Sequence, residues 1–437
     1  MQTKQRVLTG ITTTGVPHLG NYLGALKPAI AASQSDQYDG FYFLADYHAL
    51  IKCQDPQVLH RSTQEIAAIW LALGLNTDKV TFYRQSDIVE IPQLCWLLSC
   101  MTAKGLMNRS HAYKAAIDDN LQQGDHDQGI SMGLFSYPIL MAADILLFNA
   151  HYIPVGKDQI QHIEMCRDIA ARFNKVYQPL FNLPQAMVAH GEPKILSGLD
   201  GRKMSKSYGN IIPLFAPSDQ LRKLINQIIT NSLKPGQPKD PDTCTLFEIY
   251  NAFATSTAVE QMRQRYANGI GWGQMKQELF EYLDTYLSPA RQRFEHIIQD
   301  PQYIETQLQQ GAVKARQYSQ PFMAQLCAVV GITALDKTLA TPREKNVVKQ
   351  AKSGDEHSSI LAGRQKAIAI ARQREAEQMA QVQAELDQLL AAIKNASDPQ
   401  AAYAAQIQKL QQAITYATNK QSKLLRKKLQ LLQAVVL

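Results

Sequence analysis

The run Lys203–Ser207, which reads KMSKS, is the stretch of the chain best suited to chemistry. It lies between Leu199–Arg202 and Tyr208–Asn210, in a short hydrophilic segment whose Asp, Gly and Asn residues favour turns. Two ammonium groups three residues apart, with small hydroxyls between them, can close over a polyphosphate. They can then neutralise the charge that develops on its oxygens during phosphoryl or nucleotidyl transfer. The alternative is an ordinary solvated basic loop.

A second candidate is the glycine-containing segment Gly10–Asn21, which follows the first apolar run. Glycines at a strand-to-helix turn let a nucleotide approach the backbone closely, and a helix beginning near Gly20 favours phosphate at its N-terminus. His18 can donate a hydrogen bond to a phosphate oxygen. Alone, a glycine-rich first turn is a weak signal of nucleotide binding.

Asp144 is one carboxylate within the nearly apolar stretch Ser136–Leu146. Burying an unpaired carboxylate is costly, so we expect Asp144 to find a hydrogen-bond donor. An N-cap or an internal salt bridge is the alternative to a ligand. A further segment, Ile153–His162, combines a strand end, a glycine turn and a polar pair that opens a helix, which is a usual place for ligand contacts.

Two of these segments resemble the signatures of class I aminoacyl-tRNA synthetases. Lys203–Ser207 is similar to the KMSKS motif and His18–Asn21 to the HIGH motif, and their order and spacing fit. Ser136–Leu146, Ile153–His162 and Asp46–Ala49 resemble the tryptophanyl-tRNA synthetases, and the likeness runs from about residue 6 to residue 331. Two positions depart from the pattern: Thr12–Thr14 stands where Gln-Pro-Ser is common, and Lys157 stands where an acidic residue is expected.

The resemblance implies a tryptophan site in which Asp144 accepts a hydrogen bond from the indole N–H. A site built to bond a particular N–H rejects analogues that lack it, such as phenylalanine. Tyr137 and Gln159 would hold the amino acid, and His48, otherwise a core histidine, would line the pocket. The implied tryptophan-binding residues are His48, Tyr137, Met141, Asp144 and Gln159. We assign His162 to helix packing.

The resemblance also implies an ATP site and four catalytic residues. His18, Lys203 and Lys206 would stabilise the pyrophosphate side of the transition state, together with Lys114, which is otherwise a surface lysine. Mg²⁺ would travel on the ATP, and no metal would be held by the protein itself. The implied ATP-binding residues are Gly10, Thr12, Thr13, Thr14, Gly20, Asn21, Gly156, Lys157, Asp158, Ile195, Lys203, Met204, Ser205, Lys206 and Ser207.

The elements around these residues predict an α/β fold with a doubly wound, parallel, Rossmann-type sheet. Short β-rich runs alternate with amphipathic stretches, which places ligands at the carboxyl ends of the strands. The predicted strands are Arg6–Ile11, Gly40–Ala45, Lys79–Tyr83 and Tyr152–Val155, and the predicted helices Asn21–Ser33, Val58–Leu73 and Gln159–Phe173. The polar stretch Asp118–Gly129 is expected to be a mobile excursion.

After Pro213 the pattern is mostly helical, which predicts an α-helical second domain, with Ser218 as the cap of its first helix. We expect a catalytic domain at 1–215, an anticodon-recognition domain at 216–335 and a linker at 336–360. A basic helical hairpin should occupy 361–437, with the break Asn395–Pro399 between its helices. The further helices predicted are Gln220–Ile229, Leu246–Ala254, Gln274–Leu287 and Val313–Val330, with a loop at Asn231–Thr243.

Composition and charge indicate the number of domains, the cellular compartment and the kind of partner to expect. The chain has 437 residues, 45% of them apolar, which is enough for two or three domains with real cores. Its six cysteines form no C-x-x-C pair, no apolar run is long enough to cross a bilayer, and the start lacks a secretory signal, so we expect a cytoplasmic protein. Residues 340–437 hold 15 Lys and Arg and 8 Asp and Glu, which accounts for the whole net charge of +7. This tail could grip tRNA or contact another protein.

The implied reaction has two steps. The carboxylate of L-tryptophan attacks the α-phosphate of ATP to form tryptophanyl-adenylate and pyrophosphate, and the acyl group then passes to the terminal ribose of tRNA(Trp). Catalysis would rest on positioning and charge stabilisation, and a homodimer without membrane contact is expected. The alternatives are a tyrosyl-tRNA synthetase, which shares both motifs, and a nucleic-acid-binding or regulatory protein that has kept the fold.

Overall fold

The computed structural model describes residues 4–120, 127–156, 159–188, 196–336, 380, 383–416, 425, 428–430 and 432. The chain divides into two compact units, residues 1–340 and residues 341–437. Of the predicted excursion 118–129, residues 121–126 lie outside the described part. The predicted linker lies outside it from residue 337 onward.

The first unit is built on a five-stranded parallel sheet in the order β3-β2-β1-β4-β5, as predicted for the fold class. The four strands expected from the sequence are confirmed, and β5 is an additional short edge strand. The strands are β1 (Gln5–Thr12), β2 (Tyr38–Ala45), β3 (Thr81–Arg84), β4 (Tyr152–Pro154) and β5 (Gln185–Met187).

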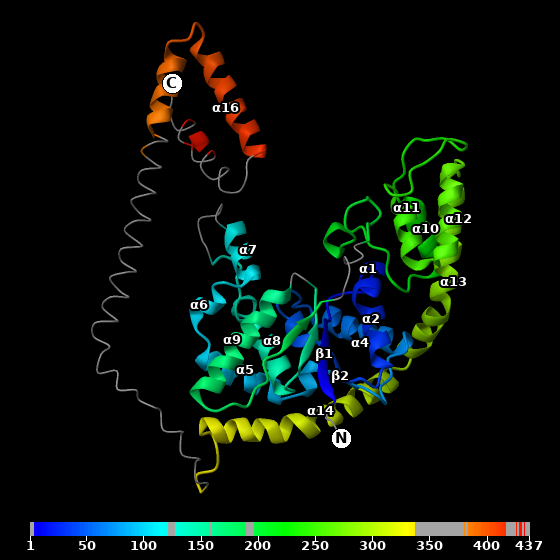
Figure 1. Ribbon diagram of the computed structural model, residues 1–437, viewed down its shortest axis with the longest axis vertical. Helices are drawn as coiled ribbons and strands as arrows, with labels where there is room; N and C mark the ends of the chain where they lie inside the picture. The colour runs from blue at the N-terminus through cyan, green and yellow to red at the C-terminus, as the bar shows by residue number, and fades with distance from the viewer. Residues whose placement is uncertain are drawn as a thin grey trace. The chain divides into compact units, whose positions relative to one another are not determined.

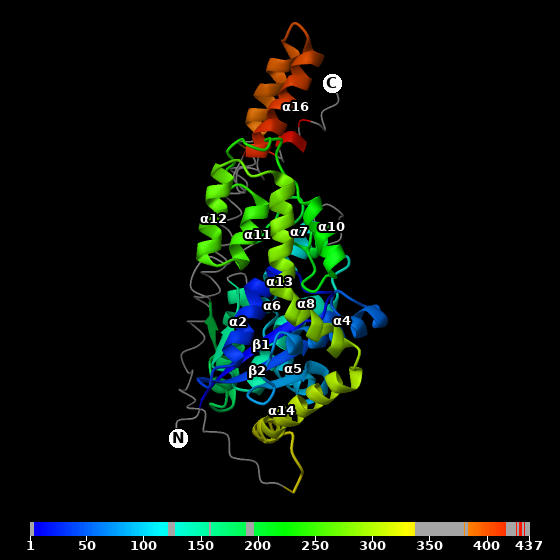
Figure 2. The ribbon, with the colours of Figure 1, turned by 90° about the vertical axis from the view of Figure 1, so that its right-hand side faces the viewer.

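Helices cover both faces of this sheet, so that each face closes a separate hydrophobic core (Figures 1 and 2). Because successive side chains of a strand point to opposite faces, Tyr42 and Leu44 of β2 join one core, whereas Phe41 and Phe43 join the other. The helices of this part are α1 (Leu19–Asn21), the π-helix η1 (Tyr22–Leu26), α2 (Lys27–Ser33), α3 (Asp46–Ala49), α4 (Pro56–Ala72), the 3₁₀ helix η2 (Gln85–Asp87), α5 (Glu90–Met101), α6 (Lys104–Met107), α7 (His111–Asn120), α8 (Met132–Leu147), α9 (Ile160–Val176) and the 3₁₀ helix η4 (Lys206–Tyr208).

The rest of the first unit is helical, as predicted, and two of its helices, α13 and α14, are longer than the sequence suggested. In Figures 1 and 2, α13 runs from the lobe formed by α10–α12 back to the sheet, where α14 crosses it. Gly311 of α14 lies so close to β3 that an added Cβ would stand 1.5 Å from the Phe82 carbonyl oxygen. These helices are α10 (Ser218–Gln227), α11 (Thr245–Phe253), α12 (Ser256–Ala267), α13 (Trp272–Ile298) and α14 (Pro301–Val330).

The predicted cap at Ser218 is wrong. The helix α10 already begins at Ser218, and Pro217 occupies the capping position. By contrast, Asp300 caps α14 by accepting a hydrogen bond from the Tyr303 N–H, and Pro301 follows at the first helical position, where its missing N–H costs nothing.

The second unit contains the predicted helical hairpin. A helix over residues 383–394 is followed by α16 (Pro399–Tyr416), and Asp398 caps α16 by accepting from the Gln400 and Ala401 N–H groups. Leu386 and Ile393 of the first helix are buried together with Leu432 near the chain end. The apolar residues of the hairpin are therefore covered by a third segment, which contains Leu432.

Candidate functional site

A cavity of about 840 Å³ opens at the carboxyl ends of β1, β2 and β4; we call it the deep cavity. Its walls come mainly from α3, α7, α8 and the start of α9, as expected for a ligand site on a parallel sheet. All five residues expected to bind tryptophan line it, together with Gly10, Thr12, Thr14 and Gly156 from the expected ATP set: the five are His48, Tyr137, Met141, Asp144 and Gln159.

Asp144 is fully buried at this cavity (0% exposed), and both of its oxygens are hydrogen bonded. His48 Nε2 lies 2.9 Å from Oδ2, and Gln85 Nε2 donates to Oδ1 at 2.7 Å and to Oδ2 at 3.0 Å. Burial raises the pKa of Asp144, while the hydrogen bonds from His48 and Gln85 act to lower it. The hydrogen-bond donors to Asp144 thus include two side chains of the protein, His48 and Gln85. The sequence had not pointed to Gln85.

Gln85 is held rigidly in this position. It is itself fully buried, and its Oε1 accepts a hydrogen bond from the Tyr47 N–H at 3.1 Å. Because that oxygen is occupied by a backbone donor, the amide NH₂ must point the other way, towards Asp144. The sequence signal was available: Gln85 lies two positions after the predicted strand Lys79–Tyr83, at the edge of the sheet where ligands bind.

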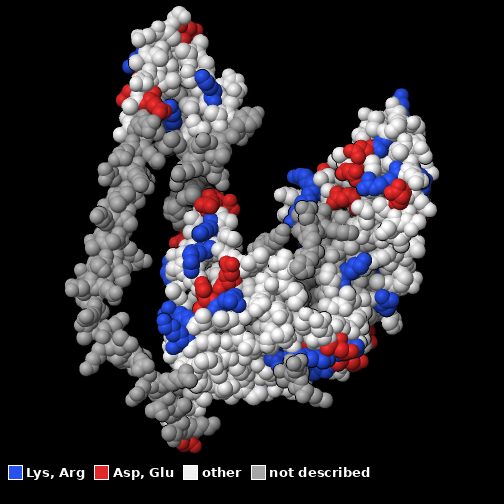
Figure 3. Space-filling model, in the orientation of Figure 1, with Lys and Arg blue, Asp and Glu red and all other residues white. Residues whose placement is uncertain are grey.

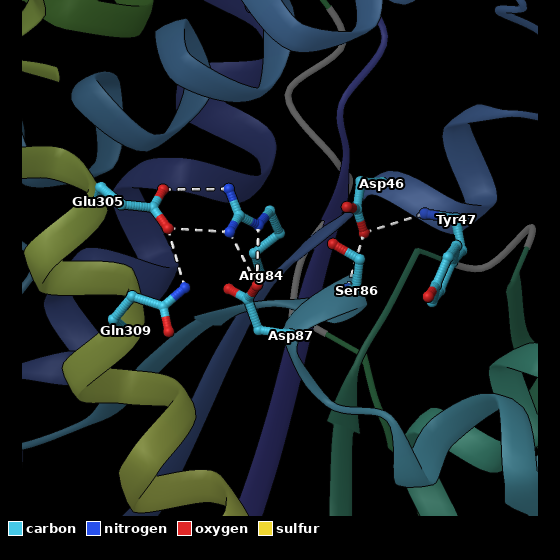
Figure 4. Close-up of polar contacts among 7 residues, drawn as sticks. All are labelled: Asp46, Tyr47, Arg84, Ser86, Asp87, Glu305 and Gln309. Atoms are coloured by element: carbon cyan, nitrogen blue, oxygen red, sulfur yellow. Dashed lines mark hydrogen bonds and ion pairs between the residues drawn. The ribbon is translucent and has the colours of Figure 1, made fainter.

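The neighbours of this glutamine fix the backbone on both sides (Figure 4). Arg84 makes paired hydrogen bonds to Glu305 of α14 and also binds Asp87. The Ser86 N–H donates to Asp46 Oδ1 at 3.1 Å. A bidentate arginine–carboxylate pair is among the stronger polar contacts, so the end of β3 is tied to α14.

A second hydrogen-bonded chain lies on another wall of the deep cavity. Tyr137 Oη is 2.5 Å from His162 Nε2, and His162 Nδ1 is 2.9 Å from Gln159 Oε1. His162 is buried and lines the cavity. Its assignment to helix packing was therefore incomplete, because it joins two of the residues expected to hold the amino acid.

A second cavity, of about 750 Å³, lies between the Gly10–Asn21 turn and the Lys203–Ser207 loop; we call it the loop cavity. Thr12 and Thr14 line both cavities, so the two adjoin. The expected nucleotide and catalytic residues that line the loop cavity are Thr12, Thr14, His18, Gly20, Asn21, Lys203, Met204, Ser205 and Lys206.

Lys206 joins the two sides of the loop cavity. Its Nζ donates to the carbonyl oxygens of Gly15, at 2.9 Å, and Thr14. Burial lowers the pKa of Lys206. The ammonium group is therefore held at the glycine turn by neutral acceptors, which an anion can replace.

His18 is buried beside these lysines. Its N–H donates to Asn21 Oδ1 at 3.1 Å, while its ring Nδ1 has no hydrogen-bond partner among the described residues. Burial, followed by the charges of Lys206 and Lys203, lowers the pKa of His18 to about 4. The imidazole is thus neutral near pH 7, with one N–H to donate.

The Lys203–Ser207 loop is shaped by Asn210. Its Oδ1 accepts from the Ser205 N–H at 2.8 Å, and its Nδ2 donates to Asp200 Oδ1 at 2.6 Å and to the Lys203 carbonyl. The hydrogen bond from Asn210, followed by the hydrogen bonds and charge of Arg202, lowers the pKa of Asp200 to about 2. Met204 is buried in one core (3% exposed) and anchors the loop.

The remaining expected residues lie elsewhere. Thr13 is fully buried, and its Oγ1 lacks a partner within the described ranges. Ser207 bonds to Ser205 Oγ at 2.8 Å, and Lys114 is exposed on α7; neither is among the described residues that line the two cavities. Lys157, Asp158 and Ile195 are outside the described residues.

This geometry agrees with comparisons to known proteins. Residues 1–288 match the family of class I tRNA synthetases for tryptophan and tyrosine. The tryptophan–tRNA ligase of Pseudomonas aeruginosa is 55% identical over 353 residues, which cover 79% of each chain. That of Neisseria meningitidis serogroup A is 52% identical over 334 residues, which cover 76% of this chain and 99% of the relative. A solved tryptophanyl-tRNA synthetase from Campylobacter jejuni, complexed with ADP and tryptophan, is 40% identical with a TM-score of 0.69, covering 75% of this chain and all of its own.

The fold and paired motifs therefore define a class I aminoacyl-tRNA synthetase. Within that class, the chain belongs to the tryptophanyl-tRNA synthetases. It is an aminoacyl-tRNA ligase that activates L-tryptophan with ATP and charges tRNA(Trp). In the part of the chain that the structure describes, no helix is long and apolar enough to cross a membrane.

Proposed function

We propose that the deep cavity binds tryptophan with its indole N–H on Asp144. A carboxylate offers roughly four lone-pair directions, and His48 and Gln85 use three of them, so one remains for another donor. Ligand specificity follows because an amino acid without that N–H would leave the buried carboxylate under-bonded. The fully buried Asp144 at an otherwise largely apolar cavity is the observation that carries this proposal.

The other end of the amino acid would meet Tyr137 and Gln159. Their oxygens lie on the wall of the deep cavity that also includes Gly156, near the strand end of β4. An α-ammonium group is a donor with three N–H bonds and requires acceptors of this kind. The tryptophan carboxylate would then face Thr12 and Thr14, where the two cavities adjoin.

The triphosphate of ATP would occupy the loop cavity. The tryptophan carboxylate attacks the α-phosphorus, and the bond to the β-phosphate oxygen breaks to release pyrophosphate. Lys203 and Lys206 would stabilise the charge on the departing phosphates, and the neutral His18 would donate one N–H. Lys114, on α7, and the undescribed residues Lys157, Asp158 and Ile195 are expected to complete the ATP site.

Mg²⁺ would enter with ATP as part of the substrate. No carboxylate is among the described residues that line the loop cavity. Nor does any group of three or more His, Cys, Asp or Glu that could hold a metal occur across the described ranges. Lysine, hydroxyl and amide groups suit phosphate oxygens, and the phosphates themselves supply the oxygen ligands that Mg²⁺ prefers.

For tRNA we propose two contact regions. The helices after Pro213 would receive the anticodon end, and the basic tail 361–437 would grip the phosphate backbone elsewhere. Five cations of the tail would contact phosphate: Lys420, Lys423, Arg426, Lys427 and Lys428. Lys428 pairs with Glu385 at 2.7 Å, and the other four are outside the described residues. On the face seen in Figure 3, cationic and anionic side chains are intermixed, so a long single-sign track is not visible there.

A homodimer would cover an exposed apolar face of α5. Trp96 is 69% exposed, and Pro92 and Cys100, one turn before and after it, are exposed on the same face. A large exposed aromatic side chain is typical of a protein interface. Replacing Trp96 with Glu should yield monomers in light scattering, and an unchanged mass would reject this face.

We place the enzyme in the cytoplasm, where reduced thiols suit its six free cysteines.

Amino-acid-dependent ATP–pyrophosphate exchange tests the proposal. The wild type should respond to tryptophan and not to tyrosine, and Asp144→Ala should lose most of this response. Exchange stimulated by tyrosine alone would replace the assignment with a tyrosine enzyme. A complete absence of exchange would favour a nucleic-acid-binding or regulatory role.

A further inference from the structure

Asp46 joins the two turns that leave the neighbouring strands β2 and β3. The parallel pairing of these strands ends at Leu44 and Arg84, so that two residues further on Asp46 would stand opposite Ser86. There the Asp46 carboxylate takes the place of a backbone carbonyl, and its Oδ1 accepts from the Ser86 N–H at 3.1 Å. The same oxygen accepts from the Tyr47 N–H at 3.1 Å, and Figure 4 shows both contacts. One carboxylate oxygen therefore binds the backbone of both turns.

These two turns carry the protein donors to Asp144. His48 lies in α3, two residues after Asp46. Gln85 lies in η2, directly before Ser86. His48 Nε2 is 2.9 Å from Asp144 Oδ2, and Gln85 Nε2 donates to Oδ1 at 2.7 Å. Because Asp144 belongs to α8, its two donors reach it from the ends of two different strands, and their geometry depends on how firmly the two turns are held together.

Asp46 acts from outside the deep cavity. It is half-buried, and it is not among the described residues that line the cavity. Its carboxylate is a charged acceptor, which makes stronger hydrogen bonds to backbone N–H groups than a neutral oxygen does. Gln85 Oε1 also accepts from the Tyr47 N–H, so the turns are joined at two neighbouring points. A misplacement of roughly 1 Å in such a network is enough to lower the activity of an enzyme strongly.

We propose that Asp46 is a positioning residue for indole recognition. By holding the two turns together, it places His48 and Gln85 so that Asp144 keeps a free lone pair directed at the indole N–H. This inference rests on the proposed function, which places that N–H on Asp144. It also means that a side chain outside the cavity controls how well the enzyme discriminates between tryptophan and ligands without the N–H.

Two ligands test this role by equilibrium binding to the full chain without ATP: L-tryptophan and its benzothiophene analogue, in which a ring sulfur replaces the indole N–H. Asp46→Ala should raise the Kd for tryptophan about tenfold, the scale of one hydrogen bond to a charged group. The Kd for the analogue, which offers no proton to Asp144, should change less than about twofold. The ratio of the two Kd values should therefore shift about tenfold. Equal weakening of both ligands would mean that Asp46 only stabilises the fold, and unchanged binding of both would also overturn the inference.

Two further variants separate the position of the acceptor from its charge, and they serve if Asp46→Ala disturbs folding. Asp46→Asn keeps a carbonyl oxygen at the same place and should bind tryptophan within about twofold of the wild type. Asp46→Glu keeps the charge but moves the acceptor by one methylene, so it should lose part of the discrimination. The opposite order of these two variants would contradict the inference.

Asp55→Ala is the matched control for the loss of backbone hydrogen bonds. Asp55 is an exposed carboxylate that accepts from the Gln57 and Val58 N–H groups at the start of α4. Its replacement should lower stability, as expected for a lost helix cap, and leave the ratio of the two Kd values unchanged. A shift of this ratio in Asp55→Ala as large as that in Asp46→Ala would show that the effect is a general loss of stability.

Asp144→Asn separates this inference from the function on which it rests. If Asp144→Asn reduces the discrimination between the two ligands but Asp46→Ala does not, only the role of Asp46 is wrong. If Asp144→Asn leaves the discrimination unchanged, the indole N–H does not lie on Asp144, and the inference falls with the proposed function.

Discussion

The two adjoining cavities differ in how far their polar groups are already bonded. In the deep cavity, Asp144 receives three hydrogen-bond contacts, and His162 bridges its neighbours with both ring nitrogens. In the loop cavity, Lys206 rests on backbone carbonyls, and His18 Nδ1 lacks a partner among the described residues. The polar groups of the deep cavity are already oriented by protein partners, whereas the loop cavity contains cations and donors that suit an incoming anion.

This difference separates selection from catalysis. A buried network whose members are already oriented can discriminate between ligands, because a wrong ligand leaves a buried group unsatisfied. Cations that exchange neutral carbonyls for phosphate oxygens gain most when negative charge builds up, which is in the transition state. We therefore expect substitutions in the deep cavity to change the KM for tryptophan, and substitutions in the loop cavity to change kcat.

The largest effect is expected from Asp144→Asn. The variant keeps the shape, but an NH₂ replaces one oxygen, and the two lone pairs of the remaining oxygen leave none for the indole N–H once His48 and Gln85 are bonded. The KM for tryptophan in pyrophosphate exchange should rise about 100-fold or more, and the KM for ATP should change less than about twofold. Asp39→Asn, which alters a carboxylate bound to Arg6, is the matched control and should have little effect. A lower kcat with unchanged KM for tryptophan would contradict the comparison.

Lys206→Met is expected to act on the rate. Single-turnover adenylate formation should slow about 100-fold, the usual scale for one lost charge-stabilising group, with tryptophan affinity within about twofold. Arg202→Met removes a neighbouring cation that pairs with Asp200 and is not among the described residues lining the loop cavity. Its rate should stay close to that of the wild type. Equal slowing in both variants would mean that the rate depends on the total positive charge of the loop and not on the position of Lys206.

Gln85→Leu sharpens the comparison on the deep side. The variant removes one donor to Asp144 and one of the two oxygens that accept from the Tyr47 N–H, so the KM for tryptophan should rise about tenfold. Gln309→Leu, an exposed glutamine in the network of Figure 4, should change this KM by less than about twofold. If the two glutamine variants behave alike, Gln85 does not orient Asp144.

Much of this architecture follows from local patterns in the sequence. Apolar runs and helical periodicity predicted four strands and most long helices, because burial on one or both faces controls both patterns. The edge strand β5 has three residues and α12 is largely polar, so neither leaves a clear periodic signal. The predicted cap at Ser218 failed because Pro217, with its fixed backbone angle, starts the helix one residue earlier.

For the site, the sequence indicated which residues belong to it, but not which side chains they contact. Asp144 stood out because its neighbours are apolar. Gln85 is 59 positions away and meets Asp144 only when β3 ends beside α8. Similarly, a histidine on a helix next to a ligand segment does not reveal that its ring joins Tyr137 to Gln159. Such contacts depend on tertiary packing, which no local pattern records.

The tail provides a smaller effect outside both cavities. Deleting residues 341–437 should raise the KM for tRNA a few-fold and reduce its salt dependence, because phosphate contacts are lost. Adenylate formation should change less than about twofold, since the deep and loop cavities lie entirely in the first unit. An unchanged KM for tRNA would reject the tRNA grip and leave contact with another protein as the role of the tail.

The smallest effect concerns the protonation of His18. Its pKa of about 4 lies below the ordinary 6.5, so His18 should not titrate between pH 8 and 6. Because the unfolded chain binds this proton more readily, His18 reduces the stability of the fold as the pH falls from 6.5 towards 4. Lys206→Met should raise the pKa of His18 only in part, since burial is the larger cause. An NMR titration checks this, and a midpoint near 6.5 in the wild type would contradict it.

The separation of selection from catalysis is tested most directly by combining Asp144→Asn with Lys206→Met. The quantity to measure is kcat/KM for tryptophan in adenylate formation, for the wild type, both single variants and the double variant. If the two cavities act independently, the losses should multiply, which means additive free energies to within about 0.5 kcal/mol. A double variant no worse than the poorer single variant would show that both residues act as one unit, and would contradict the account.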